Sequence, residues 1–298
     1  MLQPGLLPSR CWQRSTSGSC PVLDALRASG LTINPALSAH VGAPVVSPDE
    51  CDTALSRVAS GLSPGPDGIP TEVYRKFSKH LSRLLASVLS AIGRTGQVPP
   101  GFLDGVLIAL FKKGDATVVA NYRPITLLNT DYRLLAKVLA ARLGPALGGV
   151  IGPEQSAFLQ GRQIGDNVMF LQLLPTLLRA EKRGAAVAFL DFVKAYDTVD
   201  RSFLLAAMEC MGVGAGFMRW VRTLLSHTPF VALINGFCSH EAHTRAGVRQ
   251  GCPLSPLLYL FVAQALQCWL LASDVGIMVA GARRAATQFA DGWRCWPP

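Results

Sequence analysis

The chain is organised around one stretch, which reads Phe189-Leu190-Asp191-Phe192-Val193-Lys194-Ala195-Tyr196-Asp197-Thr198-Val199-Asp200. The apolar segment from Ala185 to Phe189 leads into it after Gly184, and this pattern predicts a buried strand. Three carboxylates then follow within ten residues. A carboxylate that leaves an apolar strand is costly unless a cation or a hydrogen-bond network receives it. The end of this strand is therefore the first candidate for a functional site.

The three aspartates of this stretch have different local settings. Asp197 and Asp200 precede a helix that we expect to begin near Arg201, and aspartate is a favoured N-cap residue. Capping is the favoured interpretation for Asp200. Asp191 comes too early to cap a helix, so a metal ligand is the better interpretation for that position.

Downstream, a second segment combines turn residues with an apolar helix: Gly247-Val248-Arg249-Gln250-Gly251-Cys252-Pro253-Leu254-Ser255-Pro256-Leu257-Leu258-Tyr259. A turn so rich in Gly and Pro brings the backbone close to a ligand. Farther on, Thr287 to Asp291 reads as a strand. Asp291-Gly292 suits a tight hairpin turn, and Trp293 to Trp296 is long enough to start a return strand.

Upstream, short apolar and turn-rich segments alternate with helical patterns. Periodicity predicts a helix from Thr71 whose apolar face comprises Val73, Phe77, Leu81, Leu84, Leu85, Val88, Leu89 and Ile92. Before that helix lie a capping box at Ser47-Pro48-Asp49-Glu50 and a double turn at 63–70. After it come a strand at Val106 to Phe111, followed by Lys112-Lys113-Gly114-Asp115, and the segment Asn121-Tyr122-Arg123-Pro124-Ile125-Thr126-Leu127-Leu128. The last of these segments are Pro153 to Arg162 and two predicted strands, at Pro229 to Asn235 and His243 to Val248.

Taken in order, these segments resemble the motifs of reverse transcriptases from non-LTR (LINE-type) retrotransposons. The resemblance covers roughly residues 47 to 292, and the segment at 247–259 matches the family's second palm motif nearly letter for letter. The resemblance implies an α+β fold, the fingers and palm of a right-hand polymerase, with an antiparallel palm sheet backed by helices. It also implies an RNA-directed DNA polymerase that takes an RNA template, a DNA primer and dNTPs.

The resemblance implies a site for two Mg²⁺ ions. Two-metal nucleotidyl transfer places the ions ~3.5–4 Å apart, and Mg²⁺ prefers carboxylate oxygens. By resemblance, Asp191 and Asp291 supply the carboxylates and the Phe192 carbonyl supplies a further oxygen. We expect these aspartates, 100 residues apart (291 − 191), to lie close together at the ends of neighbouring palm strands.

By resemblance, Arg123 reaches the triphosphate of the incoming nucleotide, and a planar guanidinium suits that task because it grips phosphate oxygens in pairs. Lys112 and Lys113 would add positive charge there, although a solvated basic loop is the alternative for both lysines.

The remaining site residues are implied by resemblance alone. Tyr196 matches the position that stacks under the sugar and excludes a 2′-hydroxyl. Gln250 and Gly251 lie against the nucleotide and its templating base. Gly161 and Arg162 belong to the segment that meets the template strand.

One position departs from the family pattern, since Gly292 stands where a second adjacent aspartate is expected. We therefore expect a chain that is truncated within the last catalytic palm motif, lacks a thumb and polymerises poorly. A second hypothesis is a non-catalytic retrotransposon remnant that at most binds nucleic acid. The expected parts are a poorly ordered leader (1–46), fingers (47–183), palm (184–292) and an unrelated tail (293–298).

Composition is consistent with a nucleic-acid partner. The chain has 298 residues, half of them hydrophobic, and a formal charge of +9, which favours a polyanion. Eight cysteines form no C-x-x-C pair and no signal peptide is recognisable, so we expect an intracellular protein of the nucleus or cytoplasm. Pro256 to Ala272 falls short of the ~20 residues that span a bilayer, which predicts a buried helix and no membrane partner. The sequence does not predict an oligomeric state.

Overall fold

The computed structural model describes residues 20–182, 184–185, 187–192, 194–273, 275–279, 282–289 and 292–295. The chain folds into two compact units, each assembled from separate stretches. Unit 1 comprises Met1–Pro35, Gly144–Val213 and Pro256–Pro298, and unit 2 comprises Ala36–Leu143 and Gly214–Ser255. The predicted fingers and palm each contribute to both units, so the division at residue 183 stays a prediction.

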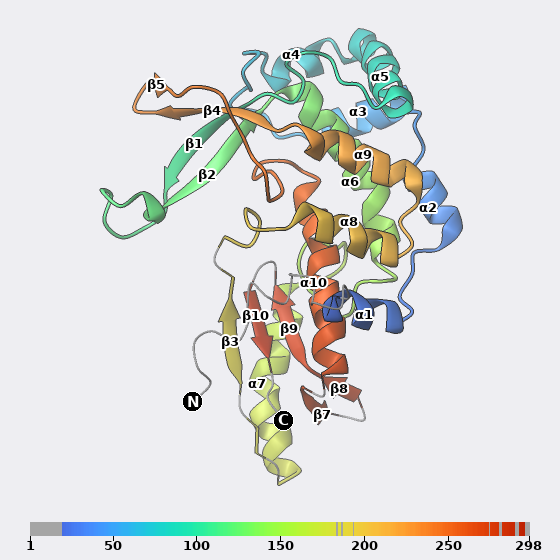
Figure 1. Cartoon of the computed structure of the whole chain (residues 1–298), viewed down its shortest axis with the longest axis vertical. Helices are drawn as coiled ribbons and strands as arrows, with labels where there is room; N and C mark the ends of the chain where they lie inside the picture. Colours follow the sequence, from blue (N-terminus) through green and yellow to red (C-terminus); the bar gives the residue numbers. More distant parts are fainter. Residues whose placement is uncertain are drawn as a thin grey trace. The chain divides into compact units, whose positions relative to one another are not determined.

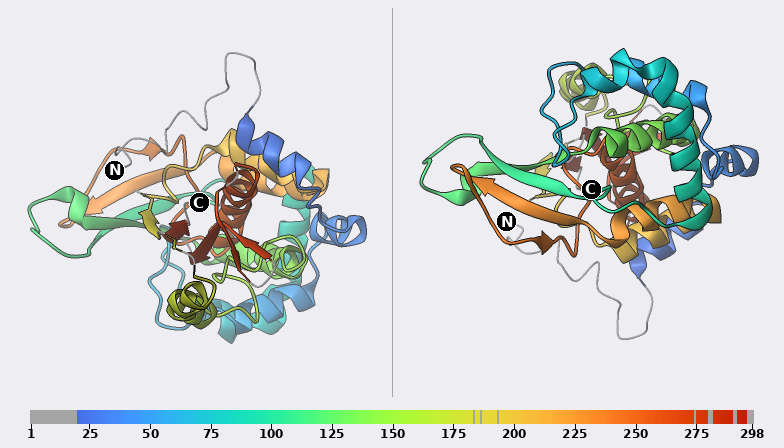
Figure 2. Two further views of the ribbon diagram at one scale, coloured as in Figure 1. Left: turned by 90° about the horizontal axis from the view of Figure 1, so that it is seen from below. Right: turned by 90° about the horizontal axis from the view of Figure 1, so that it is seen from above.

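Unit 2 combines a group of helices with a mixed sheet that projects from them (Figures 1 and 2). Its helices are α2 (Pro35–Val41), α3 (Pro48–Ser56), α4 (Thr71–Lys76), α5 (Ser78–Thr95), the 3-10 helix η1 (Val119–Asn121), α6 (Thr130–Leu147) and α9 (Ala215–Ser226), with Pro35 and the last turn of α6 belonging to unit 1. Its strands are β1 (Gly105–Phe111), β2 (Tyr122–Leu128), β4 (Pro229–Ile234), β5 (Phe237–Cys238) and β6 (Ala242–His243).

The sheet of unit 2 has the order β2-β1-β4-β5, and β6 also pairs with β4. β1 runs antiparallel to β2 and parallel to β4. Asn235 and Gly236, both with positive φ, form the tight turn between β4 and β5, as the twist of a two-residue hairpin requires. The predicted second strand was wrong beyond His243, because residues 244–248 form no strand.

Unit 1 contains an antiparallel sheet of order β3-β10-β9 and a separate pair, β7 with β8. Its strands are β3 (Ala188–Asp191), β7 (Ile277–Val279), β8 (Ala282–Arg284), β9 (Ala286–Phe289) and β10 (Gly292–Cys295), and its helices are α1 (Pro21–Ala28), α7 (Ile164–Ala180), α8 (Arg201–Cys210) and α10 (Ser255–Ala272, whose first residue belongs to unit 2). Leu174 of α7 packs against Ile277 and Val279 of β7. Asn167 of α7 is hydrogen-bonded to Gln288 of β9, so a helix also contacts the antiparallel sheet, as predicted.

α10 is the predicted buried helix. Within the described residues it is long and apolar enough to cross a membrane by length and composition, but 78% of that window is buried in the protein. Core helices of this kind pass the same length and composition test, so the burial accounts for its hydrophobicity.

Three further expectations were wrong in part. Residues 20–46 form α1 and α2 with buried Val22, Leu26 and Val41, so this part of the expected leader is ordered. The helix predicted from Thr71 breaks at Phe77, where α4 ends and α5 begins, and side chains expected in its apolar face are exposed: Val73, Phe77, Leu84 and Val88. Phe189, on the edge strand β3, is 65% exposed, so the predicted burial is wrong at this residue.

An ion pair links α3 and α6 within unit 2. Ser47 Oγ accepts a hydrogen bond from Glu50 N (3.1 Å), and the Glu50 carboxylate accepts one from Ser47 N (2.9 Å), which confirms the capping box. Arg142 donates to the same carboxylate from Nε (2.6 Å) and Nη2 (2.8 Å). It also donates to the carbonyls of Ala43 and Val45, and its side chain is only 4% exposed.

We expect Arg142→Met to destabilise unit 2 by about 3–5 kcal/mol, because it leaves a partly buried carboxylate without its counter-charge. Burial raises the pKa of Glu50, but the hydrogen bonds from Arg142 and Ser47 outweigh burial and lower it. The ion pair therefore stabilises the fold above pH 4.5, the ordinary value, and this contribution is lost as the pH falls through the lowered pKa. Denaturant titrations at neutral and acid pH measure both effects. Arg83→Met, at an exposed position of α5, is the control.

Candidate polymerase site

The β1–β2 hairpin carries the three basic residues assigned to the nucleotide. Arg123 is the register partner of Leu110, and Lys112 N donates to Asn121 O (2.9 Å) just beyond the paired strands. The side chains of Lys112, Lys113 and Arg123 are exposed, and none has a salt-bridge partner among the described residues. They are therefore free to bind an anion.

The loop between these strands is held by its own hydrogen bonds. Asp115 Oδ1 accepts from Thr117 N (2.8 Å), and these bonds lower the pKa of Asp115. Asn121 Nδ2 donates to Asp115 O (2.8 Å), and Tyr122 Oη donates to Ala116 O (2.9 Å). The one carboxylate of the loop is thus hydrogen-bonded to Thr117 and forms no salt bridge with either lysine among the described residues.

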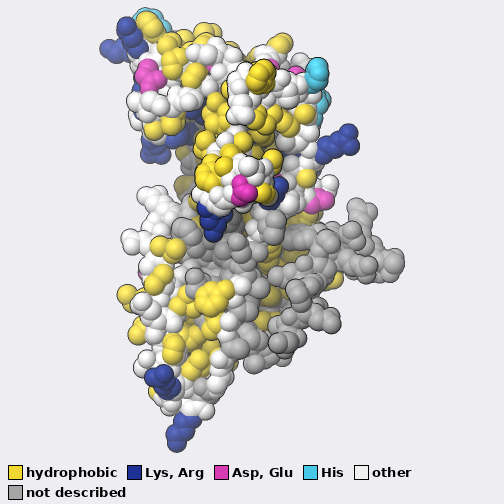
Figure 3. Space-filling model, turned by 90° about the vertical axis from the view of Figure 1, so that its left-hand side faces the viewer, with side chains coloured by type: hydrophobic (Ala, Val, Ile, Leu, Met, Phe, Trp, Pro, Cys, Tyr) yellow, Lys and Arg dark blue, Asp and Glu magenta, His cyan; other side chains and the backbone are white. Residues whose placement is uncertain are grey.

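The end of this sheet also carries an aromatic and apolar surface. Phe111 contacts Tyr122 edge to face at 5.4 Å, and the strand register places Ile234 and Phe237 on the same sheet face. Figure 3 views this end, where hydrophobic side chains gather with Lys and Arg beside them. Exposed aromatic rings beside cations are suited to stacking on nucleic-acid bases.

The turn that contains Gln250 and Gly251 lies along the edge of β2. Thr126 N donates to Gln250 O (3.0 Å). Gly251 has φ +104°, and a Cβ at this position would lie 2.5 Å from Thr126 O, so only glycine fits. The close approach predicted for this turn is therefore to β2 itself. It brings Gln250 and Gly251 to the same strand as Arg123, and their contact with a nucleotide stays a prediction.

Arg249 anchors the turn, a role that the sequence analysis missed. Its guanidinium lies 5.5 Å from the ring centroid of Tyr132 and donates to Pro229 O (3.2 Å). Tyr132 Oη donates to Cys252 Sγ (3.4 Å) on the far side of the turn. Burial lowers the pKa of Arg249 and raises that of Tyr132. A charged residue within an otherwise apolar and glycine-rich segment was the available signal.

Unit 1 holds the predicted metal ligands and the predicted sugar contact. The register places Asp191 opposite Gly292, and Gly292 also pairs with Phe289 across the β9–β10 hairpin. Asp291 lies outside the described residues, and only the backbone of Asp191 is described. Phe192 is half-buried, and Tyr196 packs on Tyr259 with ring centroids 5.0 Å apart.

The metal site therefore stays a prediction. Among the residues that the structure describes, no three His, Cys, Asp or Glu side chains are grouped to hold a metal ion. The backbone register is nevertheless compatible with the site, because the residue after Asp291 lies directly opposite Asp191.

Asp200 has the helix-capping role that was predicted for it. It caps α8 by accepting a hydrogen bond from Phe203 N (2.8 Å).

Arg162, which was assigned to the template, forms hydrogen bonds to backbone carbonyls of residues 148–155. Its guanidinium donates to the carbonyls of Ile151 (2.7 Å) and Gln155 (2.8 Å), and also to those of Gly148 and Gly152. Burial lowers its pKa. Gly161, at φ +80°, is exposed beside it. A template contact at this point stays a prediction, and it is better suited to the exposed backbone at Gly161 than to the engaged guanidinium.

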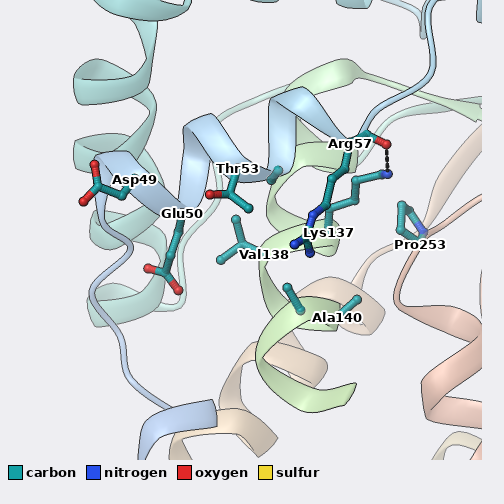
Figure 4. A pocket seen from close by; sticks show the side chains of 10 residues that line it. Asp49, Glu50, Thr53, Arg57, Lys137, Val138, Ala140 and Pro253 are labelled. Atoms are coloured by element: carbon teal, nitrogen blue, oxygen red, sulfur yellow. Dashed lines mark hydrogen bonds between the residues drawn. The ribbon is translucent and has the colours of Figure 1, made fainter. Parts of the chain in front are cut away.

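A cleft of about 480 Å³ between α3 and α6 contains none of the predicted site residues (Figure 4). Lys137 Nζ there donates to Arg57 O (2.6 Å), while the neighbouring Arg75 donates to the carbonyls of Leu55 and Ser56. These cations satisfy the last carbonyls of α3 and its C-cap, as side chains at helix C-termini do. Lys137 and Arg75 are therefore engaged in capping α3.

Comparison with known proteins decides the family. Residues 111–291, more than half of the chain, match the family model described as reverse transcriptase (RNA-dependent DNA polymerase). The chain belongs to the reverse transcriptase family. Members of this family act on a nucleic-acid template and primer with dNTPs and use divalent metal ions.

Relatives of this reverse transcriptase come from non-LTR elements, as the motifs predicted. An uncharacterised 149 kDa protein of transposon TX1 from Xenopus laevis is 34% identical over 78% of the chain and 18% of its own length. The Pol polyprotein of retrotransposable element R2DM from Drosophila melanogaster is 28% identical over 81% of the chain and 22% of its own length. The chain thus spans about a fifth of each relative. A chain of a partial Cas6-RT-Cas1–Cas2 complex aligns with TM-score 0.46 and 15% identity, covering 89% of this chain and 38% of that one.

Proposed function

We propose that this reverse transcriptase chain is an RNA-directed DNA polymerase domain that extends a DNA primer on an RNA template. The observation that carries the proposal is the register of unit 1, in which β10 begins opposite Asp191 directly after the second predicted metal ligand. In the reaction, the primer 3′-oxygen forms a bond to the α-phosphorus of a dNTP, the bond from that phosphorus to the bridging oxygen breaks, and pyrophosphate leaves.

Asp191, Asp291 and the Phe192 carbonyl would hold Mg²⁺, since carboxylate and carbonyl oxygens are the ligands this hard cation prefers. When bound, Mg²⁺ activates the attacking oxygen and neutralises charge on the leaving one. Arg123, Lys112 and Lys113 would bind the triphosphate of the dNTP. Their side chains are exposed and form no salt bridge among the described residues, which supports this assignment. Tyr196 would lie beneath the sugar, Gln250 and Gly251 beside the nucleotide, and Gly161 beside the template.

Gly292 favours a second candidate function, a domain that binds nucleic acid without polymerising. The position opposite Asp191 carries no carboxylate, so a metal site there holds one negative charge fewer. Primer extension on an RNA template with Mg²⁺ and dNTPs decides between the two. Extension supports the polymerase, whereas tight binding of an RNA–DNA hybrid without extension supports the binding domain.

Lys112 and Lys113 are also proposed to line the groove that receives the RNA–DNA hybrid, so replacing both by serine is expected to reduce the salt dependence of hybrid binding. Each phosphate contact contributes about −0.9 to the slope of log K against log salt for duplex DNA, so loss of two contacts should flatten the slope by roughly 1.8. Fluorescence anisotropy with a labelled hybrid measures the slope. The matched control is Lys79→Ser with Arg83→Ser on exposed positions of α5. An equal change in both double variants would indicate that total charge, and not the hairpin, determines binding.

A further inference from the structure

The segment at residues 154–156 is hydrogen-bonded to strand β9 at a single residue, Gln288. Gln288 N donates to Glu154 O (2.9 Å), and Ser156 N donates to Gln288 O (3.1 Å), so that Gln155 forms an isolated parallel bridge with Gln288. Sequence reasoning had placed this segment on the template. In the structure it holds the strand that leads to the predicted metal ligand Asp291.

The side chains extend the same contact into the core. Gln155 Nε2 donates to Gln288 Oε1 (3.1 Å), and Gln288 Nε2 donates to Gln267 Oε1 (2.9 Å) on α10. Gln155, Gln288 and Gln267 are 2%, 2% and 1% exposed. We call these three residues the glutamine chain. It joins three separate segments of unit 1 through β9.

Helix α7 also contributes a hydrogen bond to the backbone carbonyl of Gln288. Asn167 of α7 donates from Nδ2 to Gln288 O (2.7 Å) and to Ser156 Oγ (2.9 Å), and Ser156 Oγ donates to Gln288 O (3.2 Å). The Gln288 carbonyl therefore accepts hydrogen bonds from a backbone amide, a hydroxyl and a side-chain amide. A carbonyl has two lone pairs, so three donors use its full acceptor capacity.

The glutamine chain is a poor way to gain stability. Gln267 Nε2 has no hydrogen-bond partner among the described residues, and a buried donor without a partner destabilises the fold because its hydration is lost and not replaced. Three apolar side chains of similar size would fill the same space without this cost. Apolar contacts, however, allow a short strand to slip along its axis, whereas a chain of directional hydrogen bonds fixes its position.

We propose that Gln155, Gln288 and Gln267 are positioning residues, which fix β9 along its axis so that the β9–β10 hairpin stays in register with Asp191. The inference rests on the proposed function, because its consequence is the alignment of the metal ligands. Gln288 lies three residues before Asp291 (291 − 288), and the hairpin returns at Gly292 opposite Asp191. A shift of one residue would turn every side chain of β9 to the other face of the sheet.

The test is a variant in which Gln155, Gln267 and Gln288 are all replaced by methionine. Removing the three side chains together leaves no side-chain amide of the glutamine chain without its partner, although the buried Ala157 N–H loses its acceptor, Gln155 Oε1 (3.0 Å), so thermal stability should change only modestly. Mn²⁺ affinity, measured by electron paramagnetic resonance on the intact chain, should nevertheless fall about tenfold to a hundredfold, the scale seen when groups that orient metal ligands are lost. Primer extension should lose kcat with little change in KM for dNTP.

The matched control is Gln264→Met, another buried amide of α10, whose Oε1 accepts from Gly152 N (2.8 Å) and which makes no hydrogen bond to β9. It should lose stability and keep the wild-type Mn²⁺ affinity. Wild-type Mn²⁺ affinity and kcat in the triple variant would overturn the positioning role while leaving the proposed function intact. No Mn²⁺ binding by the unaltered chain would overturn the proposed function and this inference with it.

Discussion

Asp191→Asn should reduce primer extension by about a thousandfold, the scale on which removal of preorganised electrostatic stabilisation acts. The amide keeps the size of the carboxylate but removes the charge that would hold Mg²⁺ at the end of β3. Steady-state extension on an RNA template, with the Mg²⁺ concentration varied, measures the loss. Binding of an RNA–DNA hybrid should be unchanged, because the substitution alters neither the proposed template contact at Gly161 nor the basic residues Lys112 and Lys113.

Asp200→Asn is the matched control for this substitution. It makes the same change nine residues later (200 − 191) in the same stretch. Asparagine caps helices as well as aspartate does, so the hydrogen bond from Phe203 N and the rate of extension should both survive. Equal losses in the two variants would contradict the assignment of Asp191 as the metal ligand.

Gly292→Asp is expected to raise primer extension by roughly tenfold to a hundredfold, the range typical of losing or gaining a supporting group at a metal site. The new carboxylate lies opposite Asp191 in the register and restores a negative charge to the predicted Mg²⁺ site. Gly292 lies in a strand, a backbone conformation that aspartate adopts readily.

The decisive comparison for this gain is Gly292→Asn, which adds nearly the same atoms without the charge. If asparagine and aspartate raise the rate equally, the benefit comes from stiffening the hairpin and not from metal binding. If neither variant extends a primer while hybrid binding stays tight, the chain is better described as a nucleic-acid-binding domain.

Elements defined by neighbouring residues were predictable from the sequence. These elements depend on residues that are close together in the sequence. They are the capping box at Ser47, the cap of α8 by Asp200, the strand at Gly105–Phe111 and the helix at Ser255–Ala272. The family motifs added the order of the segments. The resemblance carried by these motifs implied both the α+β class and the reverse transcriptase family.

Features that depend on distant partners were not predictable in this way. The break at Phe77 has no Gly or Pro to signal it. The hydroxyl of the buried Ser90 accepts a hydrogen bond from Val46 N (2.8 Å), which lies 44 residues away. Arg162 was assigned to the template, and Gln155 lies in the same segment, because a polar residue in a motif does not disclose its partner. Their hydrogen bonds to Ile151 and Gln288 depend on how the chain folds back on itself.

Each unit is assembled from stretches that are far apart in the sequence, and this affects folding during synthesis. β1 pairs with β4, and Val106 meets Val231 only after 125 further residues have been added (231 − 106). At ~5–20 residues per second on the ribosome, this strand waits roughly 6 to 25 seconds with an unpaired edge. Such an edge is a template for pairing with other chains. The yield of native protein should therefore depend on translation speed and on chaperones that cover nascent strands.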